Sequence, residues 1–342
     1  MVTLITGANA DATGVDRYAQ ELVRALASAG REPNLRTLER REWNVFGRKV
    51  GGLVSIAWQR AKQAPPTHGL VHALDPAVAT RGADIVTVHD LIPETFPTGG
   101  LATRLDWALS RANTRRAPHL VAISQATAAD IVQRWQVDPA RVTVIHHGID
   151  PARFTPSERR PAWFPDGRVA IYVGDDHPRK NLRLAIEALG RLKADGDDVS
   201  FVRLGRTRFP ALTEQWRGRA RTLGVRVVEP GYVTDGDVVA ALSAADVFLW
   251  PTRAEGFGFP PLEAMACGTA VVALDTPVNR EILGDAASYH GDQVEAAAAA
   301  IRGALDAPAS VETVRRYAAG YSWARTAKQT LALYDHVQAA RP

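Results

Sequence analysis

The alternation of apolar and polar segments along the chain predicts repeated units of strand, loop and helix. Residues 2–6 form a short β-branched run that ends at Gly7, a pattern typical of a buried strand. Residues 15–29 then place Tyr18 and Leu22 on one face of a helix. A strand, a glycine-containing loop and a helix in this order are the opening of a doubly wound α/β domain.

The same pattern continues to about residue 150 and then pauses. The pattern predicts a helix over 103–117 and places Ser124 at the N-cap of a further helix. The stretch 31–66 is charged and irregular and predicts no clear element. Prolines recur over 151–167, which is typical of a linker. Further strands of this first half are predicted at 70–74, 84–88, 119–123 and 142–145.

After the prolines the alternation restarts, which predicts a second α/β domain. The two domains would cover 1–152 and 166–320, with a final helix over 322–338. Two such domains face each other across a cleft, and open parallel sheets bind ligands at the carboxyl ends of their strands. The predicted strands are 168–173, 199–204, 225–228, 246–250 and 270–274, and the predicted helices are 181–193, 211–223, 236–245, 261–267 and 292–305.

Composition excludes several classes of protein. The chain has 342 residues, of which 46% are hydrophobic and 23% charged, so it is neither disordered nor collagen-like. No apolar run approaches the roughly 18 residues of a membrane-spanning helix. The first seven residues lack the basic start of a signal peptide. A single cysteine, Cys267, excludes an intramolecular disulfide and a cysteine zinc cage. We therefore expect a cytoplasmic protein.

The net charge of +4 lies entirely in residues 1–155. The predicted helix 103–117 carries Arg104, Arg111 and Arg115 together with Leu105 and Trp107. Basic residues mixed with Trp and Leu can dock on anionic lipid headgroups, which would place the protein peripherally on the inner face of the membrane. The alternative is a solvated basic face with Leu105 and Trp107 in the core. No motif points to nucleic acid.

The segment 254–269 contains the strongest candidate chemistry. Glu255 follows the predicted strand 246–250 directly, and Gly256 and Gly258 let backbone N–H groups approach a ligand closely. Two prolines then favour a helix start, with Glu263 expected in its first turn. A helix N-terminus beside glycine-rich backbone binds anions, and the two carboxylates can hold hydroxyl groups.

The spacing Glu255-x7-Glu263 resembles the signature of retaining glycosyltransferases of family 4, which have the GT-B fold. The resemblance implies two Rossmann-like domains that face a cleft, an acceptor-binding domain followed by a nucleotide-sugar-binding domain. It also implies that the C-terminal helix, with residues 322–342, crosses back to the first domain. Seven further segments resemble the family in the right order, at 14–22, 87–93, 123–131, 144–150, 172–182, 231–235 and 244–248.

The resemblance implies a role for each matched residue of the second domain. Glu255 matches the carboxylate that holds donor-sugar hydroxyls, and Glu263 matches the residue that binds the nucleotide ribose. Arg179 and Lys180 match the basic pair on the diphosphate; Arg offers a planar fork and Lys a point charge. The backbone of four residues faces the sugar and diphosphate, and that of three others reads the base. These two sets are Gly256, Phe257, Gly258 and Phe259, and Gly231, Tyr232 and Val233.

In the first domain, Gly14 and Val15 match the loop that closes over the phosphates, and His89 matches a histidine near the reacting carbon and the acceptor. Together these matches imply a retaining transfer of a hexose from a GDP- or UDP-sugar to a hydroxyl of a glycan or lipid-linked acceptor. Segments 89–93 and 178–182 resemble mannosyltransferases of cell-surface glycan assembly and favour mannose. No cofactor and no metal are expected. The alternative is a non-catalytic subunit that binds sugar nucleotide without turnover.

Some features depart from the family pattern. Asp175 and Asp176 stand beside a predicted phosphate site, where they could point to solvent, be screened by Arg179, or contact an acceptor. The loop 7–14 lacks the adjacent glycines that relatives often have, and this loop also argues against a dehydrogenase cofactor site.

Two Asp-Gly-Asp pairs, at 195–197 and 235–237, resemble metal-binding motifs, but both are predicted in turns. The second pair is also expected to provide the N-cap of the helix 236–245.

Overall fold

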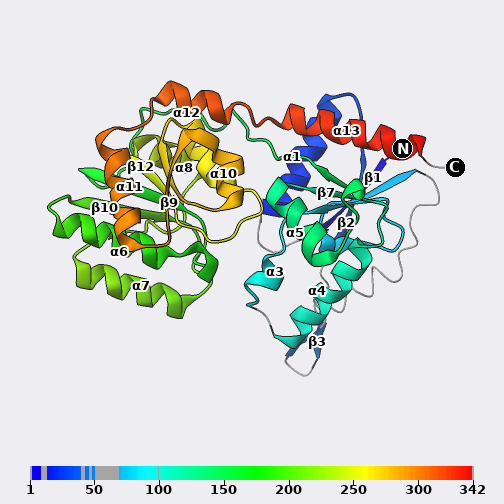
Figure 1. Cartoon of the computed structure of the whole chain (residues 1–342), viewed down its shortest axis with the longest axis horizontal. Helices are drawn as coiled ribbons and strands as arrows, with labels where there is room; N and C mark the ends of the chain where they lie inside the picture. Colours follow the sequence, from blue (N-terminus) through cyan, green and yellow to red (C-terminus); the bar gives the residue numbers. More distant parts are fainter. Residues whose placement is uncertain are drawn as a thin grey trace. The chain divides into compact units, whose positions relative to one another are not determined.

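A computed structural model describes residues 2–8, 14–39, 43–45, 48–50, 69–98 and 100–340. The chain divides into two compact units (Figure 1), one formed by Met1–Gly148 with Ser322–Pro342 and the other by Ile149–Tyr321. Among the described residues, no helix is long and apolar enough to cross a membrane.

The first unit is built on a six-stranded parallel sheet in the order β2-β1-β5-β6-β7-β8. The strand order reverses between β1 and β5, so the carboxyl ends of these strands form the switch point of this sheet. A separate antiparallel pair joins β3 (Trp43–Val45) to β4 (Arg48–Val50). The strands of the main sheet are β1 (Val2–Ala8), β2 (Asn34–Glu39), β5 (Leu70–Ala73), β6 (Ile85–Val88), β7 (His119–Ala122) and β8 (Val142–Val144).

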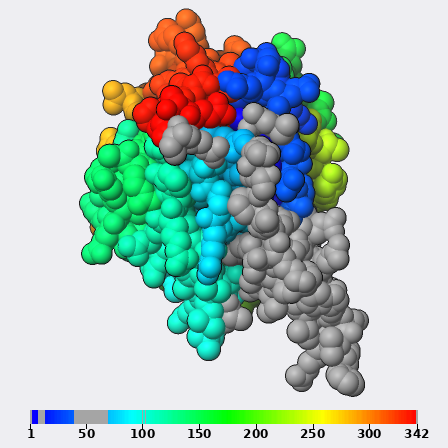
Figure 2. Space-filling view, turned by 90° about the vertical axis from the view of Figure 1, so that its right-hand side faces the viewer, coloured from blue at the N-terminus to red at the C-terminus, as the bar shows by residue number. Residues whose placement is uncertain are grey.

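Helices cover this sheet, and the last helix of the chain is one of them. Figure 2 shows α13 in red beside α1 in blue on the surface of the first unit. Ser124 caps α5 as expected, accepting a hydrogen bond from Thr127 N at 3.0 Å. The helices are α1 (Gly14–Ser28), α3 (Ile92–Thr95), α4 (Leu101–Thr114), α5 (Gln125–Trp135) and α13 (Trp323–Ala339), with short 3-10 turns η1 (Pro76–Val78) and η2 (Pro139–Arg141).

The second unit has a parallel sheet in the order β11-β10-β9-β12-β13-β14. Its order reverses between β9 and β12, where Val247 pairs with Ala170. Ligands of doubly wound sheets bind at such a reversal, because neighbouring helices there leave the sheet on opposite faces. The strands are β9 (Arg168–Val173), β10 (Val199–Leu204), β11 (Val227–Val228), β12 (Val247–Trp250), β13 (Ala270–Leu274) and β14 (Ala287–His290).

The central strands of this sheet are buried along almost their whole length, as expected for a parallel sheet with helices on both faces. The helices are η3 (Pro178–Lys180), α6 (Leu182–Ala194), α7 (Pro210–Leu223), α8 (Asp235–Ala244), α9 (Phe259–Ala266), α10 (Pro277–Leu283), η4 (Gly284–Ala286), α11 (Val294–Asp306) and α12 (Val311–Ala318).

The predicted fold class, two parallel α/β units, is confirmed, but the local boundaries differ in places. The proline-rich stretch 151–167 belongs to the second unit: the Ser157 N–H donates to the Ser243 hydroxyl at 3.1 Å, and Arg159 forms an ion pair with Asp237. The second unit begins at Ile149, whose N–H donates to Tyr321 O at 3.0 Å. β2, β14, α10 and α12 were not predicted. Of the segments discussed above, 9–13, 40–42, 46–47 and 51–66 lie outside the described residues.

Candidate functional site

Three charged side chains converge at the reversal of the second sheet. Arg179 and Lys180 lie in η3, which follows β9, and Glu255 follows β12. One oxygen of Glu255, Oε1, accepts hydrogen bonds from the Arg179 guanidinium and from Lys180 Nζ, the latter at 2.6 Å. Residues that the sequence places 75 positions apart therefore form one cluster at the place where an α/β sheet binds its ligand.

The cluster is largely withdrawn from water. The side chains of Arg179, Lys180 and Glu255 are 14%, 8% and 10% exposed. Burial lowers the pKa of Lys180, although the nearby carboxylate opposes this shift. Burial by itself would raise the pKa of Glu255, but the charges of Lys180 and Arg179 outweigh it and hold that pKa below its usual range. The carboxylate is therefore ionised near neutral pH.

Two residues that the sequence analysis missed hold this cluster in place. The Lys180 ammonium lies 4.5 Å from the centre of the Trp250 ring, a cation–π contact, and Trp250 in turn stacks on Tyr172. The Thr252 hydroxyl donates to Glu255 Oε1 at 3.0 Å. Trp250 ends β12 and Thr252 follows it closely. Their closeness to Glu255 along the chain was the one feature of the sequence that could have indicated their role.

Two hydrogen bonds to backbone carbonyls tie the two loops of the cluster together. The N–H of Arg253 donates to Arg179 O at 2.8 Å, and the Arg179 guanidinium donates to Ala254 O at 2.6 Å. These bonds fix η3 against the loop after β12, so the cluster is preorganised by the fold.

The glycine-rich loop leads from the cluster into α9. Gly258 is the N-cap of this helix at φ +91°, a left-handed conformation that L side chains rarely adopt, which explains glycine there. The Phe257 ring is buried against Phe259 and Tyr321, so it serves the core. Gly256 is buried beside it.

The position of Glu263 needs a correction. The side chain is buried, with 5% exposed, but it lies in the second turn of α9 and not in the first. The helix begins at Phe259, two residues before the predicted start, because the prolines occupy positions inside its first turn.

The two aspartates that follow β9 have separate structural partners. Asp176 accepts from the backbone N–H groups of Arg208 and Phe209 and from the Thr213 hydroxyl, so its carboxylate caps the start of α7. Burial would raise its pKa, but these hydrogen bonds lower it below the usual value. Asp175 lies 3.4 Å from the Arg208 guanidinium. Three roles were considered for these aspartates: pointing to solvent, being screened by Arg179, or contacting an acceptor. None of them describes Asp176, because its carboxylate stabilises a helix.

The predicted base-binding edge, Gly231, Tyr232 and Val233, lies between β11 and α8. Gly231 has φ +82°, and the Tyr232 side chain is 96% exposed. The loop is therefore open to solvent, with its tyrosine ring outside the core.

The aspartates of the two Asp-Gly-Asp pairs have hydrogen-bond or ion-pair partners within the protein. Asp195 and Asp197 both receive hydrogen bonds from Arg302. The N-cap of α8 is Thr234 and not the predicted Asp235, and Asp237 completes a capping box with it. Across the described part of the chain, no group of three or more His, Cys, Asp or Glu side chains could hold a metal ion.

In the first unit, His89 follows β6 and is 8% exposed. Its Nε2 lies 2.8 Å from Leu74 O. Because a carbonyl oxygen can only accept, Nε2 is the donor in this bond, and Nδ1 is the other ring nitrogen. The ring packs against Tyr18 and His147, at centroid distances of 5.0 and 5.5 Å. This contact fixes the orientation of the imidazole.

A buried polar chain beneath His89 was not predicted. His72 Nε2 lies 2.8 Å from Thr87 Oγ1, which lies 3.1 Å from the Tyr18 hydroxyl. His72 Nδ1 lies 2.7 Å from the Tyr334 hydroxyl of α13. Burial lowers the pKa of His72 to about 3, so the ring is neutral. The chain joins α1, β5, β6 and α13 through polar groups that no sequence motif reveals.

Gly14 and Val15 form the first turn of α1, where Gly14 is exposed and Val15 half-buried. The preceding residues, 9–13, lie outside the described ranges. At the other end of the unit, Gly148 passes so close to α13 that a Cβ there would lie 2.2 Å from Trp323 N. A glycine is therefore required where the chain leaves the first unit.

The helix α4 combines features of both alternatives for the segment 103–117. Its Trp107 points inward and donates to Glu94 Oε1 at 3.0 Å. Its leucines face the other way, and the exposed fractions are 74%, 57% and 56% for Leu101, Leu105 and Leu109. Since these three occur every fourth residue, they form one apolar stripe on the surface.

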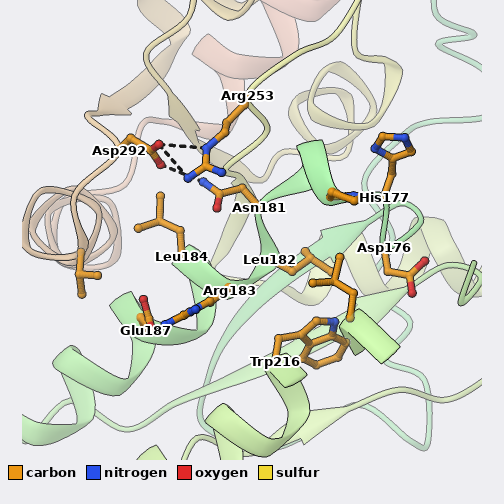
Figure 3. Close-up of a pocket in the computed structure, with 13 residues that line it drawn as sticks. Asp176, His177, Asn181, Leu182, Arg183, Leu184, Glu187, Trp216, Arg253 and Asp292 are labelled. Carbon is orange, nitrogen blue, oxygen red and sulfur yellow. Dashed lines mark hydrogen bonds and ion pairs between the residues drawn. The ribbon is translucent and has the colours of Figure 1, made fainter. Parts of the chain in front are cut away.

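A pocket of about 380 Å³ lies along α6 and α7 (Figure 3), and its lining residues Pro178 and Asn181 flank Arg179 and Lys180 in the chain. Asp176 and His177 line it, and at its rim Arg253 is paired with Asp292. None of the predicted donor-binding residues is among its lining residues. We therefore place the candidate site at the Arg179–Lys180–Glu255 cluster and not in this pocket.

Comparison with known proteins identifies the family. Residues 12–153 match the model described as Glycosyltransferase Family 4, and residues 155–320 match Glycosyl transferases group 1. The chain is 30% identical over 237 residues to phosphatidyl-myo-inositol mannosyltransferase of Mycobacterium tuberculosis (strain H37Rv), covering 65% of this chain and 62% of that protein. It is 26% identical to the O-antigen chain mannosyltransferase RfbU of Salmonella typhimurium, covering 82% and 75%. The chain thus spans less than two thirds of the length of the first of these relatives.

Solved structures share the fold. Sucrose-phosphate synthase from Thermosynechococcus elongatus superposes with a TM-score of 0.78 at 20% identity, covering 99% of this chain and 100% of that one. The Anabaena protein HepE, solved with UDP and glucose, gives 0.75 at 17% identity, covering 98% and 100%. The two family models, which follow one another along the chain, and this fold show that the protein belongs to the group 1, family 4 glycosyltransferases of the GT-B fold.

Proposed function

We propose that the protein is a retaining glycosyltransferase that moves a hexose from a nucleoside diphosphate sugar to an acceptor hydroxyl. The observation that carries this proposal is the Arg179–Lys180–Glu255 cluster at the strand-order reversal of the second sheet. A buried pair of cations at this position suits a diphosphate, and a carboxylate beside them suits sugar hydroxyls.

The proposed chemistry follows from these charges. The bond between the anomeric carbon and the diphosphate oxygen breaks, and the acceptor oxygen bonds to that carbon on the same face. The acceptor proton passes to the departing diphosphate. Negative charge grows on the leaving oxygen, and Arg179 and Lys180 are preorganised donors that stabilise it without a metal ion.

Mannose is the favoured sugar. Two of the relatives described above are named mannosyltransferases. The donor nucleotide is UDP or GDP. HepE has been solved with UDP, and the loop at Gly231 would recognise the uracil or guanine base through its backbone.

For the acceptor, we propose that His89 is the residue of the first unit that contacts the acceptor hydroxyl. Its Nε2 donates to Leu74 O, so Nδ1 is the ring nitrogen assigned to the acceptor hydroxyl. The acceptor would be a glycan or a lipid-linked sugar of cell-surface glycan assembly.

The surface of α4 supports a peripheral contact with an anionic membrane from the cytoplasmic side. The stripe of Leu101, Leu105 and Leu109 is exposed, and exposed Arg104 and Arg115 lie on the same helix and at its end. Apolar side chains flanked by arginines match the acyl boundary and the negative headgroups of such a membrane. Sedimentation with anionic vesicles should detect this contact, and neutral vesicles provide the control.

A mass-spectrometric donor screen tests the proposed function. The wild-type protein should release the sugar from one UDP- or GDP-hexose, with mannose expected, and NMR of the product should show the anomeric configuration of the donor. Glu255→Ala and Lys180→Ala should each lose most of the transfer. Binding of a donor that never loses its sugar would favour the alternative, a non-catalytic sugar-nucleotide-binding subunit. Transfer that survives in both variants would contradict the site.

A further inference from the structure

The charged cluster of Arg179, Lys180 and Glu255 poses a question about charge. By the proposed function, on which this inference rests, Arg179 and Lys180 hold the diphosphate, whereas Glu255 holds the sugar hydroxyls. In the structure, however, both cations are bonded to the same oxygen of Glu255. One set of contacts must therefore be exchanged for another when the donor enters.

The geometry favours an exchange of partners over the addition of new ones. The Lys180 side chain is only 8% exposed, so its ammonium has little water to give up, and Glu255 Oε1 lies 2.6 Å from it. A buried cation without an anion is strongly destabilised. In the absence of the donor, the carboxylate supplies the negative charge that the phosphate oxygens would supply in its presence.

Two neighbours are suited to both states. The Trp250 ring, 4.5 Å from Lys180 Nζ, can keep the ammonium in place because a cation–π contact does not require the Glu255 carboxylate. The Thr252 hydroxyl can keep its 3.0 Å bond to Glu255 Oε1 after the cations turn to phosphate. The carboxylate then remains aimed into the site with lone pairs available for hydroxyl groups.

We propose that Glu255 is a placeholder for the diphosphate: its carboxylate neutralises Arg179 and Lys180 until a donor binds, and it becomes available to the donor sugar only when phosphate oxygens take over both cations. This exchange couples the binding of the sugar to the binding of the diphosphate. When a sugar without a diphosphate enters, Glu255 is still paired with the two cations. When a diphosphate without a sugar binds, Glu255 is released but has no sugar hydroxyl to contact.

This exchange predicts an unusual variant. In Glu255→Gln the side chain keeps its shape but loses the charge that competes with phosphate. Since a competing ion-paired state lowers apparent affinity, its removal should tighten the binding of UDP or GDP about tenfold. Uridine and guanosine, which lack the diphosphate, should bind as they do to the wild type. Transfer should be lost, because the sugar hydroxyls lose their anionic partner.

Glu187→Gln is the matched control. Glu187 Oε1 also accepts from two cations, Arg183 at 3.0 Å and Arg219 at 3.3 Å, and it lies in the same unit but outside the predicted donor residues (Figure 3 labels Glu187 and Arg183). Its removal should leave nucleotide affinity unchanged.

Calorimetric titration of UDP and GDP into wild type, Glu255→Gln and Glu187→Gln tests whether Glu255 competes with the diphosphate for the two cations. Tighter nucleotide binding by Glu255→Gln, with Glu187→Gln unchanged, supports the placeholder. Equal or weaker binding by Glu255→Gln overturns it while leaving the proposed function intact. A wild type that binds neither nucleotide overturns the proposed function and the placeholder with it. If Glu255→Gln does not fold, Glu255→Asp, whose shorter side chain reaches the cations less well, should still tighten binding, and weaker binding would overturn the inference.

Discussion

The Trp107 indole N–H donates to Glu94 Oε1 at 3.0 Å, and this bond sets which face of α4 is turned inward. The same oxygen accepts from the buried Trp135 indole at 2.9 Å. Glu94 lies in α3, five residues after His89, so one carboxylate connects the segment after β6 to α4 and α5.

Removal of this carboxylate should destabilise the first unit. Glu94→Ala leaves two indole donors without their acceptor, which costs about 1–3 kcal/mol for a buried polar group. Urea unfolding followed by circular dichroism measures the loss. Glu94→Gln keeps an acceptor oxygen and should lose less. Equal stability of the alanine variant and the wild type would show that the indoles do not depend on Glu94.

The leucine stripe of α4 gives a second prediction. The double substitution Leu105→Asp and Leu109→Asp should reduce sedimentation with anionic vesicles at least about tenfold, since each buried leucine contributes about 1.5–3 kcal/mol. Val311→Asp is the control, because Val311 is also exposed but starts α12 in the second unit. Vesicle binding that survives the double substitution would place the membrane contact elsewhere or remove it.

The face of α4 illustrates what the sequence leaves undetermined. The spacing of its residues predicts a helix that carries both arginines and apolar residues, but from the sequence either Leu105 or Trp107 could face inward. The choice depends on Glu94 and Trp135, which belong to other elements. The partners of Asp176 could not be predicted for the same reason, because Arg208 and Phe209, which directly precede α7, lie more than thirty positions away along the chain.

The convergence of Arg179, Lys180 and Glu255 could be predicted more readily from the sequence. Each follows an apolar run that predicts a buried strand, and parallel strands place their carboxyl ends at one edge of the sheet. Trp250 and Thr252 were missed because their roles depend on the pairing of β9 with β12, which sets the distance of each side chain from Lys180. The chain of His72, Thr87 and Tyr334 depends likewise on the docking of α13.

The buried His72 predicts a pH dependence of stability. Burial lowers its pKa from 6.5 to about 3, so between these values the unfolded chain binds a proton that the folded chain does not. The free energy of unfolding should therefore fall as pH falls from about 6.5 toward about 3, by up to about 1.4 kcal/mol per pH unit for this residue. Urea unfolding at pH 7, 6 and 5 measures the slope.

His72→Gln isolates this contribution, because the other titrating groups are unchanged. Its slope of stability against pH should be flatter than that of the wild type over the same range. Parallel slopes for the two proteins would show that the pKa of His72 is not lowered in the folded state.

Chelation tests the proposed absence of a metal. If Arg179 and Lys180 supply the charge that stabilises the leaving diphosphate, millimolar EDTA should leave the rate of transfer within about twofold of the untreated rate. Added Mg²⁺ or Mn²⁺ should not restore activity to Lys180→Ala. A loss of transfer in EDTA that Mn²⁺ reverses would contradict a mechanism that relies on these two cations.

The central claim is that the cluster after β9 and β12 binds a nucleoside diphosphate. Its most direct test is calorimetric titration of UDP and GDP into wild type, Lys180→Met and Arg183→Met. Arg183 is a neighbouring cation on α6 with a 72% exposed side chain, so it controls for general loss of charge. We predict that one nucleotide binds the wild type and Arg183→Met equally and binds Lys180→Met at least about tenfold more weakly, the value of one charge-assisted contact. Unchanged binding by Lys180→Met, or no binding by the wild type, would contradict the account.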